Sequence, residues 1–165
     1  MSSRNLIAEI DFEVTSTKKL LDRIPEEKLT WKPHEKAMSL GQLAFHVANI
    51  PGNNLTFADE GETNVEVLAN HPIPSSKSEI IDCFTESIVK ARRILEKATD
   101  EWDAKNWVLM KNGQSIFTAP RSVMCRLLVL NHWYHHRGEL VTYLRTLDVL
   151  IPSVYGASAD EDPFA

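Results

Sequence analysis

Cysteine is scarce in this chain of 165 residues, which has two, Cys83 and Cys125. They stand far apart in segments that read as helical, each among apolar neighbours. Isolated thiols in such surroundings are typical of a reduced protein core and argue against a disulfide framework. A cysteine nucleophile or metal ligand is the alternative, but no sequence motif accompanies either residue.

Long apolar runs and an excess of positive charge are also missing. Residues 1–14 lack a long apolar region and carry early acidic residues, so they do not resemble a secretion signal. No apolar run approaches membrane-spanning length. The net charge is −5, so no basic surface indicates nucleic acid or an anionic membrane as a partner. We therefore expect a soluble, cytoplasmic protein that binds neither.

The composition that remains is that of an ordinary globular domain, with 43% hydrophobic and 25% charged residues. The length suits one domain with a substantial core, and no internal repeat divides it. We expect a single domain over residues 1–165. Its fold should occupy residues 1–150, followed by a C-terminal tail, residues 151–165, that is interrupted by proline and glycine.

Apolar residues at helical spacing predict four helices. The first runs from about Asn5 to Ile24 and stops before Pro25. The last begins near Pro120, which suits the first turn of a helix, and runs to about Leu147.

Capping residues predict the starts of the two middle helices. Ser39 and Ser76 are each followed, three residues later, by Gln or Glu, which is the spacing of a capping box. Pro51 and Gly52 either kink or end the second helix, and the polar segment 52–64 has no clear assignment.

A short irregular hairpin or loop is expected before the last helix. Asn112-Gly113 is a strong signal for a two-residue turn, and short apolar segments flank it within residues 100–118. The predicted fold class is therefore all-α. A four-helix bundle is its simplest architecture, because each amphipathic helix needs others to cover its apolar face.

The stretch LNHWYHHRGEL, residues 130–140, contains three of the six histidines. At roughly 100° per residue, with His132 at zero, His136 projects near ~40° and His135 near ~−60°. The apolar stripe of this helix is centred near His136. His132 and His136 should therefore face inward, and His135 should lie at the edge of the stripe or outside it.

An i, i+4 pair of histidines places two imidazoles on one helix face, close enough to bind one metal ion. His46 supplies a third, because it lies between apolar residues on the inward face of the second helix. Three histidines from two helices would leave part of the coordination sphere open, as in catalytic metal sites. The alternative is that each histidine is a hydrogen-bonded core residue, since spacing alone does not show which helices are neighbours.

Several segments of the chain resemble the DinB-like (DinB/YfiT-like) family of four-helix metal-binding proteins. The segments are SLGQLAFHVANIPG, LNHWYHHRGELVTYLRTL and IPSVYGASADE, together with the loop KLTWKPHEKAMS. The resemblance covers most of the chain in order. Its most specific part is the His-Arg-Gly element that follows the i, i+4 pair.

This resemblance implies an up-down-down-up four-helix bundle, commonly dimeric, that holds a divalent metal through His46, His132 and His136. The metal is zinc, nickel or iron in different members, so its identity stays open. Members with an assigned activity include thiol-dependent transferases and isomerases that use a low-molecular-weight thiol, bacillithiol or mycothiol. The family name records an association with DNA damage, and a net charge of −5 does not favour action on DNA.

Glu139 stands where many relatives have glutamine, and it projects near ~−20°, beside His132. It could orient a ligand histidine, act as a fourth ligand, or serve as a general base. The alternative is an ordinary helix salt bridge, for example with Arg145.

Five other residues have weaker claims. His34 either lines the mouth of the pocket or is a solvated loop residue, and His71 is expected at the surface. Asn49 either binds substrate or packs. Arg137 is more readily a surface residue than an anion site, and Gly138 is expected to allow a close approach between helices.

The sequence therefore predicts a metal-dependent enzyme acting on a small-molecule substrate. Its three-histidine site would activate a thiol or a water, as in a thiol-dependent S-transferase or a hydrolase. The rival hypothesis is a non-catalytic, stress-related metal-binding protein whose metal is structural.

Overall fold

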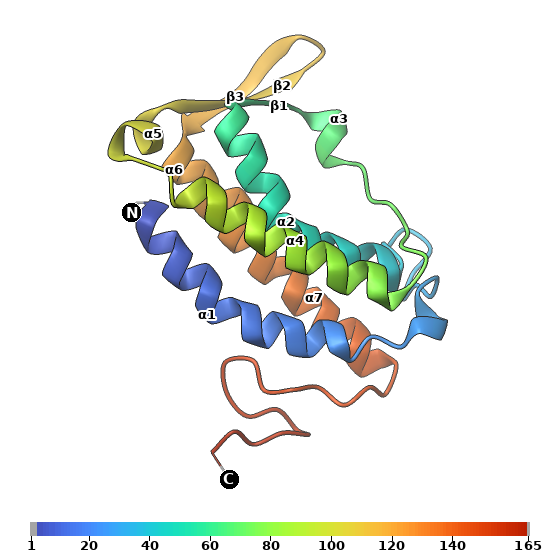
Figure 1. The fold of residues 1–165 in the computed structure, drawn as a ribbon. Helices are drawn as coiled ribbons and strands as arrows, with labels where there is room; N and C mark the ends of the chain where they lie inside the picture. The colour runs from blue at the N-terminus through green and yellow to red at the C-terminus, as the bar shows by residue number, and fades with distance from the viewer. Residues whose placement is uncertain (1–2, 165) are drawn as a thin grey trace.

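The computed structural model describes residues 3–164 as a mainly helical chain with a small sheet at one end (Figure 1). The helices are α1 (Ser3–Asp22), η1 (Glu26–Lys28), α2 (Leu40–Glu60), α3 (Val65–Leu68), α4 (Lys77–Leu95), α5 (Asp100–Ala104), α6 (Arg121–Met124), η2 (Cys125–Asn131) and α7 (His132–Thr146). Here η1 is a 3-10 turn and η2 is a π-helical segment that joins α6 to α7.

Four long helical segments pack around the core. The colours of Figure 1 show that α1 and the continuous segment α6–η2–α7 run in one direction, while α2 and α4 run in the opposite one. Their apolar faces meet in a single cluster, in which Leu20, Leu43 and Leu140 are completely buried. Within residues 3–164, no helix combines the length and apolar character needed to cross a membrane.

The predicted capping residues begin α2 and α4. The Ser39 side chain accepts a hydrogen bond from the Gln42 amide, and the Gln42 side chain accepts one from the Ser39 amide, so this capping box is complete. Ser76 likewise accepts from the Glu79 amide, but the Glu79 carboxylate accepts from Ser75 instead of closing the box.

α2 continues through Pro51 to Glu60, so the alternative that Pro51 and Gly52 end the helix is wrong. The helix bends near its middle (Figure 1). At this point the Gly52 amide donates to Ser87 Oγ at 2.8 Å. A Cβ atom on Gly52 would lie 2.6 Å from the Ser87 carbonyl oxygen, so glycine permits the close approach of α2 and α4.

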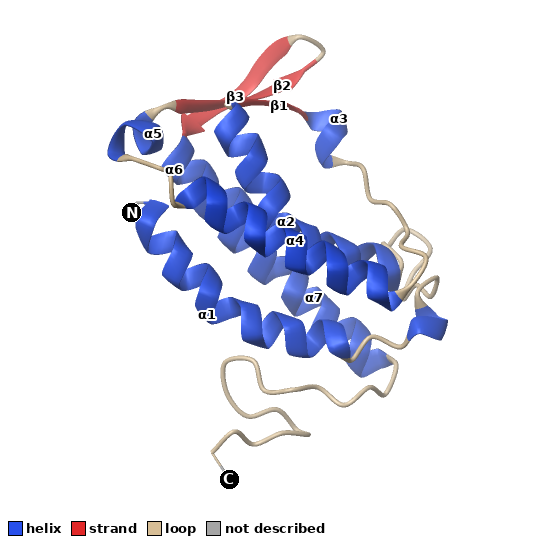
Figure 2. Ribbon diagram, in the orientation of Figure 1, coloured by secondary structure: helices blue, strands red, loops and turns tan. Residues whose placement is uncertain are grey.

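A three-stranded sheet covers one end of the helices (Figure 2). It consists of β1 (Glu62–Asn64), β2 (Asn106–Lys111) and β3 (Gln114–Pro120). β2 and β3 form the predicted hairpin, with φ of 51° at Asn112 and 75° at Gly113 in its turn. β1 pairs parallel to β2 across a long sequence separation. The all-α prediction was wrong in this respect, because no periodic pattern marks a three-residue strand.

The last helix begins at Arg121, directly after Pro120, and ends at Thr146, close to the predicted limits. Its hydrogen bonding changes to the π pattern in η2, immediately before His132. The first helix, predicted from about Asn5 to Ile24, instead covers Ser3–Asp22.

Candidate metal site

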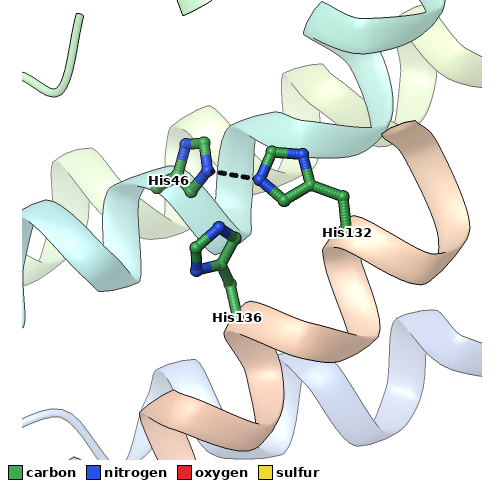
Figure 3. Close-up of side chains that lie close together, drawn as sticks. All are labelled: His46, His132 and His136. Carbon is green, nitrogen blue, oxygen red and sulfur yellow. Dashed lines mark hydrogen bonds between the residues drawn. The ribbon is translucent and has the colours of Figure 1, made fainter. Parts of the chain in front are cut away.

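Three half-buried histidines from two helices lie close together (Figure 3). His46 extends from α2, and His132 and His136 lie one turn apart at the start of α7. The Nε2 atoms of His46 and His132 are 3.2 Å apart, and the ring centroid of His136 lies 4.5 Å from that of His46. The structure therefore brings together the three predicted residues, with one nitrogen of each within 4.8 Å of the others.

The π-helical segment controls how His132 is held. The backbone amide of His132 donates to the carbonyls of Leu127 and Val129. The Leu128 carbonyl accepts a hydrogen bond from Asn54 Nδ2, and the His132 imidazole also hydrogen-bonds to the Leu128 backbone. Nε2 of His132 faces Nε2 of His46 at 3.2 Å, and its Nδ1 lies 3.5 Å from Asn54 Nδ2. A metal ion would bind His132 through whichever of these nitrogens carries no proton.

The three imidazoles are kept neutral near pH 7. Burial, followed by the charges of neighbouring imidazoles, lowers the pKa of His46 to about 3. Burial and the neighbouring His136 lower the pKa of His132 to about 4. Burial also lowers the pKa of His136, although Glu139 opposes the shift. Neutral imidazoles bind metals, so the site does not need to release protons first.

Glu139 contacts two of the neighbouring histidines. Its Oε2 lies 2.6 Å from His136 Nδ1, and its Oε1 lies 3.3 Å from Nε2 of the exposed His135. Because His136 is neutral, Nδ1–H donates to the carboxylate and Nε2 remains free on the side of His46 and His132. Of the predicted roles, the geometry fits orientation of a ligand. The suggested partner Arg145 instead pairs with Asp160.

The spacing of the nitrogens fits a metal ion. Two nitrogens bound to one tetrahedral zinc at ~2.0–2.1 Å lie about 3.3–3.4 Å apart, close to the 3.2 Å between Nε2 of His46 and Nε2 of His132. A second group of potential ligands, His135, His136 and Glu139, shares one residue with the first. It is less suited, because Glu139 already accepts a hydrogen bond from His136 and the His135 side chain is exposed.

His71 is a fourth histidine at this site, and its expected position at the surface was wrong. Its ring meets that of His46 edge-on, with the centroids 4.6 Å apart. Its carbonyl accepts a hydrogen bond from Gln42 Nε2, which fixes the loop before α4 to the start of α2. No sequence periodicity marks a loop residue of this kind, so nothing in the pattern could have identified it.

The structure also places three further residues for which the sequence made predictions. Arg137, expected at the surface, is only 2% exposed and forms an ion pair with Glu13 of α1 at 2.5 Å. Gly138, expected at a close helix contact, would have nothing within 4 Å of an added Cβ. His34 is an exposed loop residue, whose Nδ1 accepts a hydrogen bond from the Lys36 amide.

A cavity of about 60 Å³ lies beside His46 and His132. Four asparagines and several apolar side chains complete its lining, which comes from α2, α3, the following loop and η2 (Asn49, Ile50, Asn53, Asn54, Phe57, Val67, Leu68, Asn70 and Leu128). Asn49, for which binding or packing was left open, is thus a cavity residue.

The two cysteines are separate from the histidine site. Cys125 is buried, as expected, whereas Cys83 is half-buried. Burial raises the pKa of Cys83 to about 11 and that of Cys125 to about 12. Both therefore stay protonated near neutral pH, which makes them poor nucleophiles.

Comparisons with known sequences and with solved structures both find DinB-like proteins. The sequence profile of the DinB family matches residues 1–162. The uncharacterized protein YrdA of Bacillus subtilis strain 168 is 22% identical over 156 residues, covering 92% of this chain and 86% of that protein.

Solved structures of DinB-like proteins share the fold. The DinB-like protein YjoA of Bacillus subtilis matches with a TM-score of 0.66 at 20% identity, over 87% of this chain and 92% of that one. A DinB-like protein of Bacillus cereus ATCC 10987 matches with a TM-score of 0.65 at 24% identity, over 90% and 94% of the two chains.

Proposed function

The chain belongs to the DinB family, and on this basis we propose that it binds one divalent metal ion through His46, His132 and His136. We propose further that the ion serves a reaction on a small molecule, either transfer of a thiol or hydrolysis. The proposal includes the up-down-down-up bundle that the family resemblance implies, and assembly as a homodimer.

One observation carries the proposal. Three half-buried, neutral imidazoles from two helices converge on one point, with Nε2 of His46 3.2 Å from Nε2 of His132. Buried polar groups normally have hydrogen-bond partners. Three neutral imidazoles gathered at one point therefore need a partner for the nitrogens that face one another. A shared cation satisfies all three lone pairs at once.

The roles of the chain's own residues follow from their contacts. Glu139 accepts a hydrogen bond from Nδ1 of His136, so this ring presents Nε2 toward His46 and His132. When bound, a divalent cation supplies Lewis acidity that lowers the pKa of a water or thiol beside it. Neither cysteine belongs to the group of clustered histidines, and both have raised pKa values, so the proposal assigns a thiol nucleophile to a separate low-molecular-weight molecule.

Metal analysis of protein purified without chelators tests this proposal. We expect about one divalent ion per chain, and its loss in His46→Ala, His132→Ala and His136→Ala. His34→Ala is the matched control, because His34 is an exposed histidine outside the site. Absence of metal from the purified protein, or equal metal content in all four variants, would contradict the proposal.

A further inference from the structure

We infer that the cavity beside His46 and His132 receives an uncharged, carboxamide-like group of the substrate rather than an ionised one. This inference rests on the proposed function only in assigning the bound group to the substrate of the metal site. The recognition itself comes from the lining of the cavity.

The lining contains no charged side chain. Aspartate, glutamate, lysine and arginine are all absent from it, whereas four asparagines are present. In the absence of a bound metal ion, an ionised group inside would lose its hydration without gaining an opposite charge from the lining, which is unfavourable. An uncharged group carries a far smaller desolvation cost.

Three of the asparagines have side-chain amides that are free to bind a ligand. Among residues 3–164, the side chains of Asn49, Asn53 and Asn70 form no hydrogen bond, whereas Asn54 is committed to the Leu128 carbonyl. Asn49 and Asn53 stand one turn apart on α2, so both extend from the same face of that helix.

The chemistry of the side-chain amide selects the partner. Each asparagine offers two N–H donors and one carbonyl acceptor, and a carboxamide offers the same set. Two carboxamides can therefore satisfy each other's donors and acceptors. A carboxylate has no N–H to donate, so it would leave the asparagine carbonyls without a partner.

The size of the cavity limits what enters it. A volume of about 60 Å³ leaves room for a small head group beside the histidines. A carboxamide head group fits this space, with the apolar part of the lining around its attached carbon. The rest of a larger substrate would lie outside, toward the exposed Asn70 and Val67.

An NMR titration with propionamide and propionate tests the inference, because the two ligands have nearly the same shape but differ in charge. The full-length ¹⁵N-labelled protein is used as purified and again after chelation. In both forms we expect propionamide to shift the side-chain amide signals of the cavity asparagines. In the chelated form, where no cation attracts the carboxylate, propionate should bind at least about tenfold more weakly.

Variants identify the contacts. Asn53→Leu should weaken propionamide binding by about tenfold, and Asn49→Leu provides a second variant if the first folds poorly. Asn5→Leu is the control, since Asn5 is an exposed residue at the start of α1.

Two results would overturn the inference: propionate binding as tightly as propionamide to the chelated protein, or equal propionamide affinity in the Asn53, Asn49 and Asn5 variants. Either could occur with metal content unchanged, so failure here is distinguishable from failure of the metal site.

Discussion

Glu139 controls the orientation of His136 through one short contact. Its carboxylate lies 2.6 Å from Nδ1 of His136, and this bond fixes which ring nitrogen carries the proton. Partners of this kind hold a metal ligand in its binding orientation and increase its basicity. At the proposed metal site, Glu139 would therefore influence metal affinity without itself having to bind the ion.

Substitutions at Glu139 should have graded effects on metal affinity. Glu139→Ala removes the acceptor, so the metal dissociation constant should rise about 10- to 100-fold. Glu139→Gln keeps a carbonyl oxygen that accepts from Nδ1–H, so it should retain most of the affinity. Competition with a chromophoric chelator measures both constants. Glu35→Ala, at an exposed loop position, is the control, and equal affinity in all variants would exclude the orienting role.

The raised thiol pKa of Cys83 predicts slow alkylation. A thiol of pKa 11 is ~0.1% thiolate at pH 8, against about 10% for a pKa of 9, so iodoacetamide should react about 100-fold more slowly than with an unperturbed cysteine. Because the folded pKa is raised, the rate should keep increasing about tenfold per pH unit from pH 7 to 9. A Cys125→Ser variant isolates Cys83. A plateau below pH 9 would show a thiolate that the structure does not explain.

Residue patterns predicted which three histidines lie together but not their surroundings. His132 and His136 could be identified because helical geometry fixes which side chains share a face, and His46 because it interrupts an apolar stripe. His71 and Arg137 could not, because their contacts join segments far apart in the chain. The partner of Arg137 is Glu13, on a helix at the other end of the sequence.

At the scale of elements, the positions of His46 and of the cavity lining depend on how α2 packs. α2 carries His46 and most of the cavity lining, and it approaches α4 closely at Gly52. Pro51 and Gly52 lie between Asn49 and Asn53, so the helix turn that contacts α4 also carries two residues of the cavity lining. Capping and helical spacing predicted where α2 starts, but the effect of Pro51 could not be decided, because proline either kinks or ends a helix depending on its neighbours.

Two glycines should respond to substitution in opposite directions. Gly52→Ala would place Cβ 2.6 Å from the Ser87 carbonyl oxygen, so the helices must separate, at a cost of about 1–3 kcal/mol in unfolding free energy. Gly138→Ala meets nothing within 4 Å and should stabilise α7 by about 0.5–1 kcal/mol. Urea denaturation followed by circular dichroism measures both. Destabilisation by Gly138→Ala would contradict the open surroundings of that residue.

At the scale of the whole molecule, Arg137 joins three parts of the chain. From α7 it pairs with Glu13 and donates to Thr17 Oγ1, both in α1, at 2.5 and 3.0 Å. It also donates to the hydroxyl of Tyr155 in the C-terminal tail. These contacts fix α7 against α1 on the side away from the histidine site, so the helix that carries two of the proposed ligands is held without any ion.

Metal removal should therefore leave the fold intact. The core and the Arg137 contacts do not involve the three histidines, and neutral imidazoles remain packed together without charge repulsion. After chelation, far-ultraviolet circular dichroism should retain its helical signal. Zinc at 100 times its dissociation constant should then add about 2.7 kcal/mol, which corresponds to roughly 5–10 °C in Tm for a domain of this size.

A triple variant separates this stabilisation from nonspecific effects of zinc. His46→Ala, His132→Ala and His136→Ala combined should melt at the same temperature with and without zinc, whereas His34→Ala should be stabilised like the parent. Loss of the helical signal on chelation would favour the rival hypothesis, in which the metal is structural. A fold that is stable without the ion is compatible with a three-ligand site that leaves a coordination position open for a substrate, which the proposed chemistry requires.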